Sequence, residues 1–128
     1  MSTQTSIPHD VVREHVTRLT AEMHARDWQA VTVFHPPNML AFAGTTHASS
    51  DRLVCATILR DGRVLLLCPH FEYPTVEACA ELATIVTWEE DEDPYARLVT
   101  ALRDAGVGNG RLGVDGRMWL RAFEALRA

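Results

Sequence analysis

Lysine is absent from this sequence, and all 12 basic residues are arginine. Mechanisms that need a lysine amine are therefore excluded, among them phosphate-binding loops of the Walker type and enzymes that form a Schiff base with their substrate. Cysteine is scarce as well. The three residues, Cys55, Cys68 and Cys79, are an odd number at wide spacing in apolar surroundings. This pattern fits neither a disulfide framework nor a zinc ribbon.

Long apolar runs are also missing. The longest are five residues, at positions 39–43 and 64–68, whereas a transmembrane helix needs about 18 or more. The first 15 residues lack the apolar centre that a secretory signal peptide requires. We therefore expect a protein of the reduced cytoplasm that has no membrane partner.

Positive charge is not in excess, because 17 acidic residues face 12 basic ones for a net charge of -5. Five of the acids form one run at residues 89–93, and outside this run the two signs balance. Because the rest of the chain is close to neutral, it has no positive electrostatic potential that would attract phosphate groups. This argues against nucleic acid as a partner and against a polybasic membrane patch. The run itself is expected to be a solvated loop.

Six histidines are present, but none has the spacing that brings two imidazoles to one metal ion. We therefore predict no catalytic, cofactor-binding or metal-binding residue in this chain. Cys68 and His70 are two residues apart and would share one face of a strand, which suggests a small Cys/His hydrolase as a minor alternative. Pro69 between them and the lack of an orienting acid argue against that nucleophile pair.

Apolar periodicity predicts helices alternating with strands after a polar leader at residues 1–7. Helices are expected at residues 8–26, 74–82, 94–105 and 119–126, and strands at 30–34, 53–59, 64–68, 83–88 and 111–114. The Asp61-Gly62 dipeptide between two apolar runs predicts a hairpin. The 128 residues are thus expected to form a single α/β domain, with helices packed on a mixed β-sheet of about five strands.

Three local features refine this expectation. Asp93 followed by Pro94 is typical of a helix start. The helix at 74–82 is expected to turn Val76, Cys79 and Ala80 inward. The last helix is expected to pack on the sheet through three large side chains, Trp119, Phe123 and Leu126.

Residues 35–52 are expected to form a long ordered loop, because Pro36 and Pro37 cannot donate to a sheet and the residue before a proline is pushed out of the helical conformation. Long ordered loops at strand ends often carry binding groups. The alternative is that the apolar residues 39–43 form an element tucked over the core, followed by a polar tail.

Four blocks in order give the sequence a resemblance to the amino-terminal domain of the creatinase, prolidase and aminopeptidase P family. Pro37-Asn38 and Gly44 match the spacing of the family's P-N-x-x-Y-L-T-G segment. Arg52 precedes the hairpin and Glu72 follows it. Trp88 with Asp93-Pro94, and then Arg111 to Asp115, are similar to its later blocks, and the departures are Ala41, Ala43 and Asp115.

The resemblance implies a two-domain metallopeptidase whose carboxyl-terminal domain, absent from this chain, holds two divalent metal ions that activate water. The chain would be a non-catalytic N-terminal domain of an Xaa-Pro dipeptidase or aminopeptidase, with oligomerisation and substrate-access control as its roles. Its partners would be its own catalytic domain, a second copy in a homodimer, and short proline-containing peptides.

The family also places the P-N segment and the following arginine near the substrate cleft, which makes His35, Asn38, Phe42 and Arg52 the candidates for the cleft edge. Arg52 would grip a peptide carboxylate, or alternatively pair with a nearby acid at the start of a strand. The other functional interpretation is a free-standing small α/β ligand-binding or adaptor protein that lacks the catalytic half. Dipeptidase, aminopeptidase and creatinase-type activities differ mainly in that half.

Overall fold

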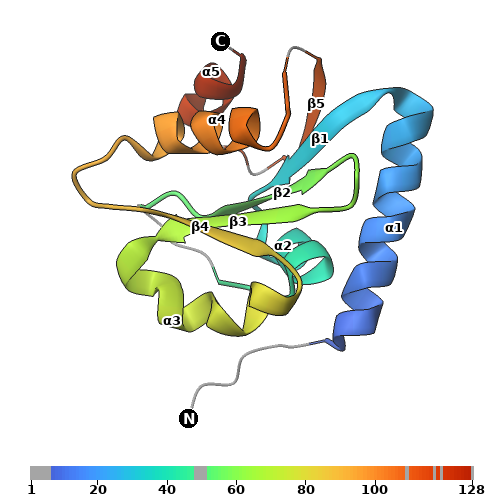
Figure 1. Ribbon diagram of the computed structural model, residues 1–128, viewed down its shortest axis with the longest axis horizontal. Coiled ribbons are helices and arrows are strands. Elements are labelled where there is room, and N and C mark those ends of the chain that lie inside the picture. The colour runs from blue at the N-terminus through green and yellow to red at the C-terminus, as the bar shows by residue number, and fades with distance from the viewer. Residues whose placement is uncertain (1–6, 48–51, 109, 117, 119, 128) are drawn as a thin grey trace.

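A five-stranded mixed sheet forms the centre of the computed structural model, which describes residues 7–47, 52–108, 110–116, 118 and 120–127 (Figure 1). The strand order is β4-β3-β2-β1-β5. The strands are β1 (Trp28–Val33), β2 (Cys55–Leu59), β3 (Val64–Pro69), β4 (Thr84–Trp88) and β5 (Arg111–Val114). The expected α/β fold with a mixed sheet is therefore confirmed.

Only the central strand runs against the others. β2 pairs antiparallel with both β1 and β3, whereas β1 pairs parallel with β5 and β3 pairs parallel with β4. The carboxyl ends of β1, β3, β4 and β5 therefore meet the start of β2 at one end of the sheet. In open α/β sheets, ligands bind at the carboxyl ends of the strands.

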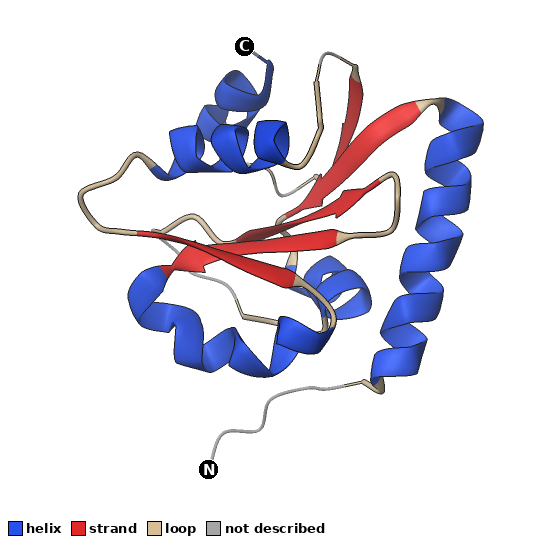
Figure 2. Ribbon diagram, in the orientation of Figure 1, coloured by secondary structure: helices blue, strands red, loops and turns tan. Residues whose placement is uncertain are grey.

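Helices cover both faces of the sheet (Figure 2). The elements on one face are α1 (His9–Arg26), α2 (Pro36–Ala43) and α3 (Tyr73–Val76), and α3 lies between the short 3₁₀ turns η1 (His70–Glu72) and η2 (Glu77–Glu81). The other face carries α4 (Pro94–Asp104) and α5 (Leu120–Arg127). Side chains alternate along each strand, so Ile58 packs in the first layer and Cys55 in the second.

Local signals in the sequence explain several element boundaries. The hairpin between β2 and β3 turns at Asp61-Gly62, and Gly62 has a φ of 94° that favours glycine. Asp93 caps α4, because its Oδ1 accepts hydrogen bonds from the backbone N–H groups of Tyr95 and Ala96. The acidic run at 89–93 is exposed, as expected.

The segment after β1 differs from the predicted long loop, because residues Pro36–Ala43 form α2. Pro36 and Pro37 occupy its first positions, where the missing N–H groups would have had no helical partner. Gly44 ends the helix with a φ of 83°. Met39 and Ala43 are buried in the first core layer, so the alternative of an apolar element over the core is the correct one.

The last helix packs differently from the expectation. Ala122 is fully buried, and Met118 and Leu126 pack against the second core layer with it. Phe123 is 42% exposed, so the expectation that it packs on the sheet is wrong. Residues four apart share a helix face, and the buried face is the one through Ala122. Trp119 lies outside the described residues.

The short helical region after β3 departs from the expectation at one residue. In the short helical region after β3, Val76 and Cys79 are buried as expected, but Ala80 is exposed, because 3₁₀ turns change the phase of the inward face. Among the described residues, none of the helices combines the length and the apolar character needed to cross a bilayer.

Candidate functional site

The candidate site lies at the carboxyl end of the sheet, where the ends of four strands and the start of β2 bring polar groups together. His35 follows β1 and Arg52 precedes β2, while η1 with Glu72 follows β3. Glu90 lies just beyond β4, and Asp115 directly follows β5. The strand directions therefore gather residues that are far apart in the sequence.

Asp115 connects the end of β5 to the start of α2. Its Oδ2 accepts hydrogen bonds from the backbone N–H groups of Phe34 and His35, both at 2.8 Å, and from Nδ2 of Asn38 at 3.2 Å. The start of a helix carries a partial positive charge, which a carboxylate stabilises. Asn38 and Asp115 thus position the P-N segment.

His35 and Phe42 lie at opposite ends of α2. Nδ1 of His35 is buried and has no hydrogen-bond partner among the described residues. Phe42 packs against the first core layer and makes an edge-to-face contact with His15, with ring centroids 6.3 Å apart. Phe42 therefore contacts α1, whereas His35 lies beside the Asp115 cap.

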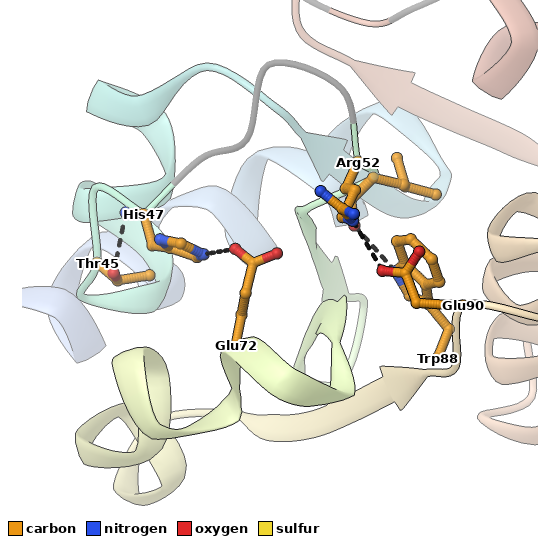
Figure 3. A network of polar contacts seen from close by, with 7 residues as sticks. Thr45, His47, Arg52, Glu72, Trp88 and Glu90 are labelled. Carbon is orange, nitrogen blue, oxygen red and sulfur yellow. Dashed lines mark hydrogen bonds and ion pairs between the residues drawn. The ribbon is translucent and has the colours of Figure 1, made fainter.

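Arg52 pairs with an acid, as the alternative interpretation expected (Figure 3). Its Nε donates to Oε1 of Glu90 at 2.7 Å. Its guanidinium carbon lies 5.1 Å from the ring centroid of Phe71, an arrangement in which a cation is attracted to an aromatic face. The side chain of Arg52 is 37% exposed, so solvent reaches part of it.

A second pair at this end of the sheet was not predicted from the sequence. Nε2 of His47 and Oε1 of Glu72 are 2.5 Å apart, and their side chains are only 17% and 15% exposed (Figure 3). The backbone N–H of His47 donates to Oγ1 of Thr45. The family resemblance singled out Glu72, but no local pattern connects it to a histidine 25 positions away.

The arrangement does not support nucleophilic chemistry at Cys68. The thiol is buried, and this burial, followed by the charge of Glu72, raises the pKa of Cys68 to about 11. A reactive cysteine needs a lowered pKa and access to substrate. His70 is exposed and directs Nδ1 toward Oγ1 of Thr87. Within the described ranges, no three His, Cys, Asp or Glu side chains are grouped so that they could hold a metal ion.

Known proteins share both sequence features and the fold of this chain. The creatinase/prolidase N-terminal domain family matches residues 15–128. The chain belongs to this family. The dipeptidase PepE from Mycobacterium ulcerans superimposes with a TM-score of 0.83 over 97% of this chain and 34% of its own, at 17% sequence identity. The N-terminal domain of an Xaa-Pro dipeptidase from Lactobacillus brevis gives a TM-score of 0.77 over 87% of this chain and 84% of its own, at 12% identity.

A curated bacterial protein is similar to this chain by sequence. An uncharacterized peptidase of Staphylococcus aureus (strain bovine RF122 / ET3-1) is 26% identical over 81 residues, which make up 63% of this chain and 23% of the relative. The chain therefore corresponds to only part of the length of that peptidase. The family match thus covers most of the chain, and the chain shares its fold with the N-terminal domain of an Xaa-Pro dipeptidase.

Proposed function

We propose that this creatinase N-terminal domain is the non-catalytic part of an Xaa-Pro dipeptidase or aminopeptidase of the cytoplasm, where it serves oligomerisation and controls substrate access. The observation that carries the proposal is the family match over residues 15–128. The structural relatives support it, because a chain of similar length is the N-terminal domain of an Xaa-Pro dipeptidase.

Hydrolysis belongs to a second domain in this proposal. Two divalent metal ions in a catalytic domain would activate the water that attacks the peptide bond. This chain would contribute a wall of the cleft and a contact in a homodimer. Short peptides with proline at the second position would be the substrates.

Arg52 is the residue that we assign to the substrate. A guanidinium binds a carboxylate through two parallel hydrogen bonds, and the accessible Arg52 at the carboxyl end of the sheet offers this chemistry. His35 and Asn38 would line the cleft edge beside the Asp115 cap, and Phe42 would continue that edge along α2.

The test compares the 128-residue chain with the product of the complete reading frame that encodes it. The complete product should hydrolyse Ala-Pro with Mn²⁺ and lose this activity with a chelator, whereas the chain alone should be inactive under the same conditions. A reading frame that stops after Ala128 would instead favour the free-standing ligand-binding or adaptor protein, and peptidase activity of the chain alone would contradict the proposal.

A further inference from the structure

Contacts made by Trp88, Glu90 and Phe71 hold the backbone and the guanidinium at Arg52, and Figure 3 shows the first two. The indole N–H of Trp88 donates to the carbonyl oxygen of Leu53 at 3.0 Å, and both residues are buried. This bond fixes the backbone next to Arg52. The ring of Phe71 supports the guanidinium at 5.1 Å, and Glu90 accepts from Nε.

These contacts use different parts of the guanidinium. Phe71 interacts with the cation through its ring, so the contact does not consume an N–H donor. Glu90 occupies Nε, which is one of the two donors on the side-on edge that grips a carboxylate. A ligand carboxylate that approaches this edge therefore meets the carboxylate of Glu90.

Among these contacts, the one with Glu90 is the easiest to exchange. The side chain of Glu90 is 59% exposed, and an ion pair in solvent contributes little to stability. A ligand carboxylate is chemically equivalent to the side chain of Glu90, so the hydrogen bond lost from Nε would be regained. Replacement of one by the other thus costs little.

We propose that Glu90 is an internal competitor, which occupies Arg52 when no ligand is present and is displaced by the free C-terminal carboxylate of a short peptide. Phe71 is the positioning residue that keeps the guanidinium in place in both states. This inference rests on the proposed role of Arg52 and adds a residue that sets the affinity of the site.

The experiment uses the ¹⁵N-labelled 128-residue chain and follows the Nε–Hε signal of Arg52 by NMR, with Arg52→Lys to assign it. The probes are the dipeptide Gly-Pro and its C-terminal amide, which lacks the carboxylate. The variants are Glu90→Gln and the matched control Asp91→Asn, which removes one charge from the neighbouring position of the exposed run. Phe71→Ala tests the positioning residue.

Gly-Pro should shift the Arg52 signal, and the amide should not. Glu90→Gln should bind Gly-Pro about two- to fivefold more tightly than the parent, the range that corresponds to loss of an exposed ion pair. Asp91→Asn should change the affinity for Gly-Pro by less than about half as much as Glu90→Gln does. Phe71→Ala should weaken binding, because the guanidinium loses its support. In the absence of peptide, Glu90→Gln should move the Nε–Hε signal strongly, whereas Asp91→Asn should not.

The outcomes separate this inference from the proposed function. If Gly-Pro shifts Arg52 with the same affinity in the parent and in Glu90→Gln, Glu90 is no competitor while Arg52 still reads the carboxylate. Equal gains in Glu90→Gln and Asp91→Asn would also overturn the inference, since they would reflect the charge of the whole run. No shift of Arg52 in any variant would remove Arg52 itself from the site.

Discussion

The carboxylate of Asp115 accepts a hydrogen bond from the side-chain amide of Asn38, although the two residues are 77 positions apart. The parallel pairing of β1 with β5 makes this possible, because it brings the carboxyl ends of both strands together. The residue before α2, His35, makes no side-chain cap of its own. Asp115 therefore supplies from another strand the acceptor that a local N-cap would normally provide.

Replacement of Asp115 should destabilise the domain. Asp115→Ala would leave the partly buried backbone N–H groups of Phe34 and His35 without their acceptor. Hydrogen bonds to charged groups contribute about 1.5 to 3 kcal/mol. The loss should appear in urea unfolding monitored by circular dichroism. Asp115→Asn retains one acceptor oxygen and should lose less. Asp91→Asn, on an exposed loop, serves as the control, and equal stability of Asp115→Ala and this control would contradict the capping role.

Two apolar truncations should have very different effects. Met39 is completely buried in the first core layer, so Met39→Ala should cost about 2 to 5 kcal/mol. Phe123 is 42% exposed and lies outside both core layers, so Phe123→Ala should cost clearly less, about 1 kcal/mol. Chemical denaturation of both variants checks this contrast. A large loss for Phe123→Ala would mean that α5 packs through its other face.

Much of the fold follows from periodicity and turn chemistry. All five strands were predicted, because each carries a short apolar run bounded by turn residues, and Asp61-Gly62 marked the hairpin. The helix α2 was missed, since the prolines that stop a strand also start a helix. For α5, spacing alone did not distinguish a face through Phe123 from a face through Ala122, because both place apolar residues four apart.

The site was less predictable than the fold. Arg52 was singled out by family resemblance, and its pairing with an acid was foreseen only as a general possibility. The actual partner, Glu90, comes from the acidic run 38 positions away, and its place depends on the strand order. Periodicity identifies which segments are strands, but it does not specify which strand ends become neighbours. For the same reason, the contact between His47 and Glu72 could not be predicted from the sequence.

Alkaline pH should destabilise the domain through its thiols. Burial raises the pKa of Cys55, Cys68 and Cys79, and that of Cys68 reaches about 11. The unfolded thiols ionise near pH 8.5, so between about pH 8.5 and 11 the unfolded state binds fewer protons than the folded state. The free energy of unfolding then falls as pH rises, by up to about 1.4 kcal/mol per pH unit for each thiol.

Urea unfolding between pH 7 and 10.5 measures this fall, and Cys68→Ala should reduce its slope relative to the parent. The comparison isolates the thiol, because tyrosine and other groups titrate equally in both proteins. An identical slope in the parent and in Cys68→Ala would show that Cys68 ionises as freely in the folded state as in the unfolded state.

The pair of His47 and Glu72 offers an internal comparison with a second His–Glu pair. His47 and Glu72 are mostly buried, whereas His9 and Glu81 are 37% and 75% exposed, with Nδ1 and Oε2 at 3.1 Å. A partly buried polar group that loses its partner carries a desolvation cost of about 1 to 3 kcal/mol. Exposed pairs contribute much less, because water solvates both groups.

Double-mutant cycles at neutral pH test this difference, with alanine at each position of each pair and the free energy of unfolding as the measurement. We expect a coupling energy of about 1 kcal/mol or more between His47 and Glu72, and a coupling close to zero between His9 and Glu81. The coupling should be large only for the first pair, because the mostly buried His47 and Glu72 connect the segment after α2 to η1 at the candidate site. Similar small couplings in both cycles would mean that the contact between His47 and Glu72 does not stabilise the carboxyl end of the sheet.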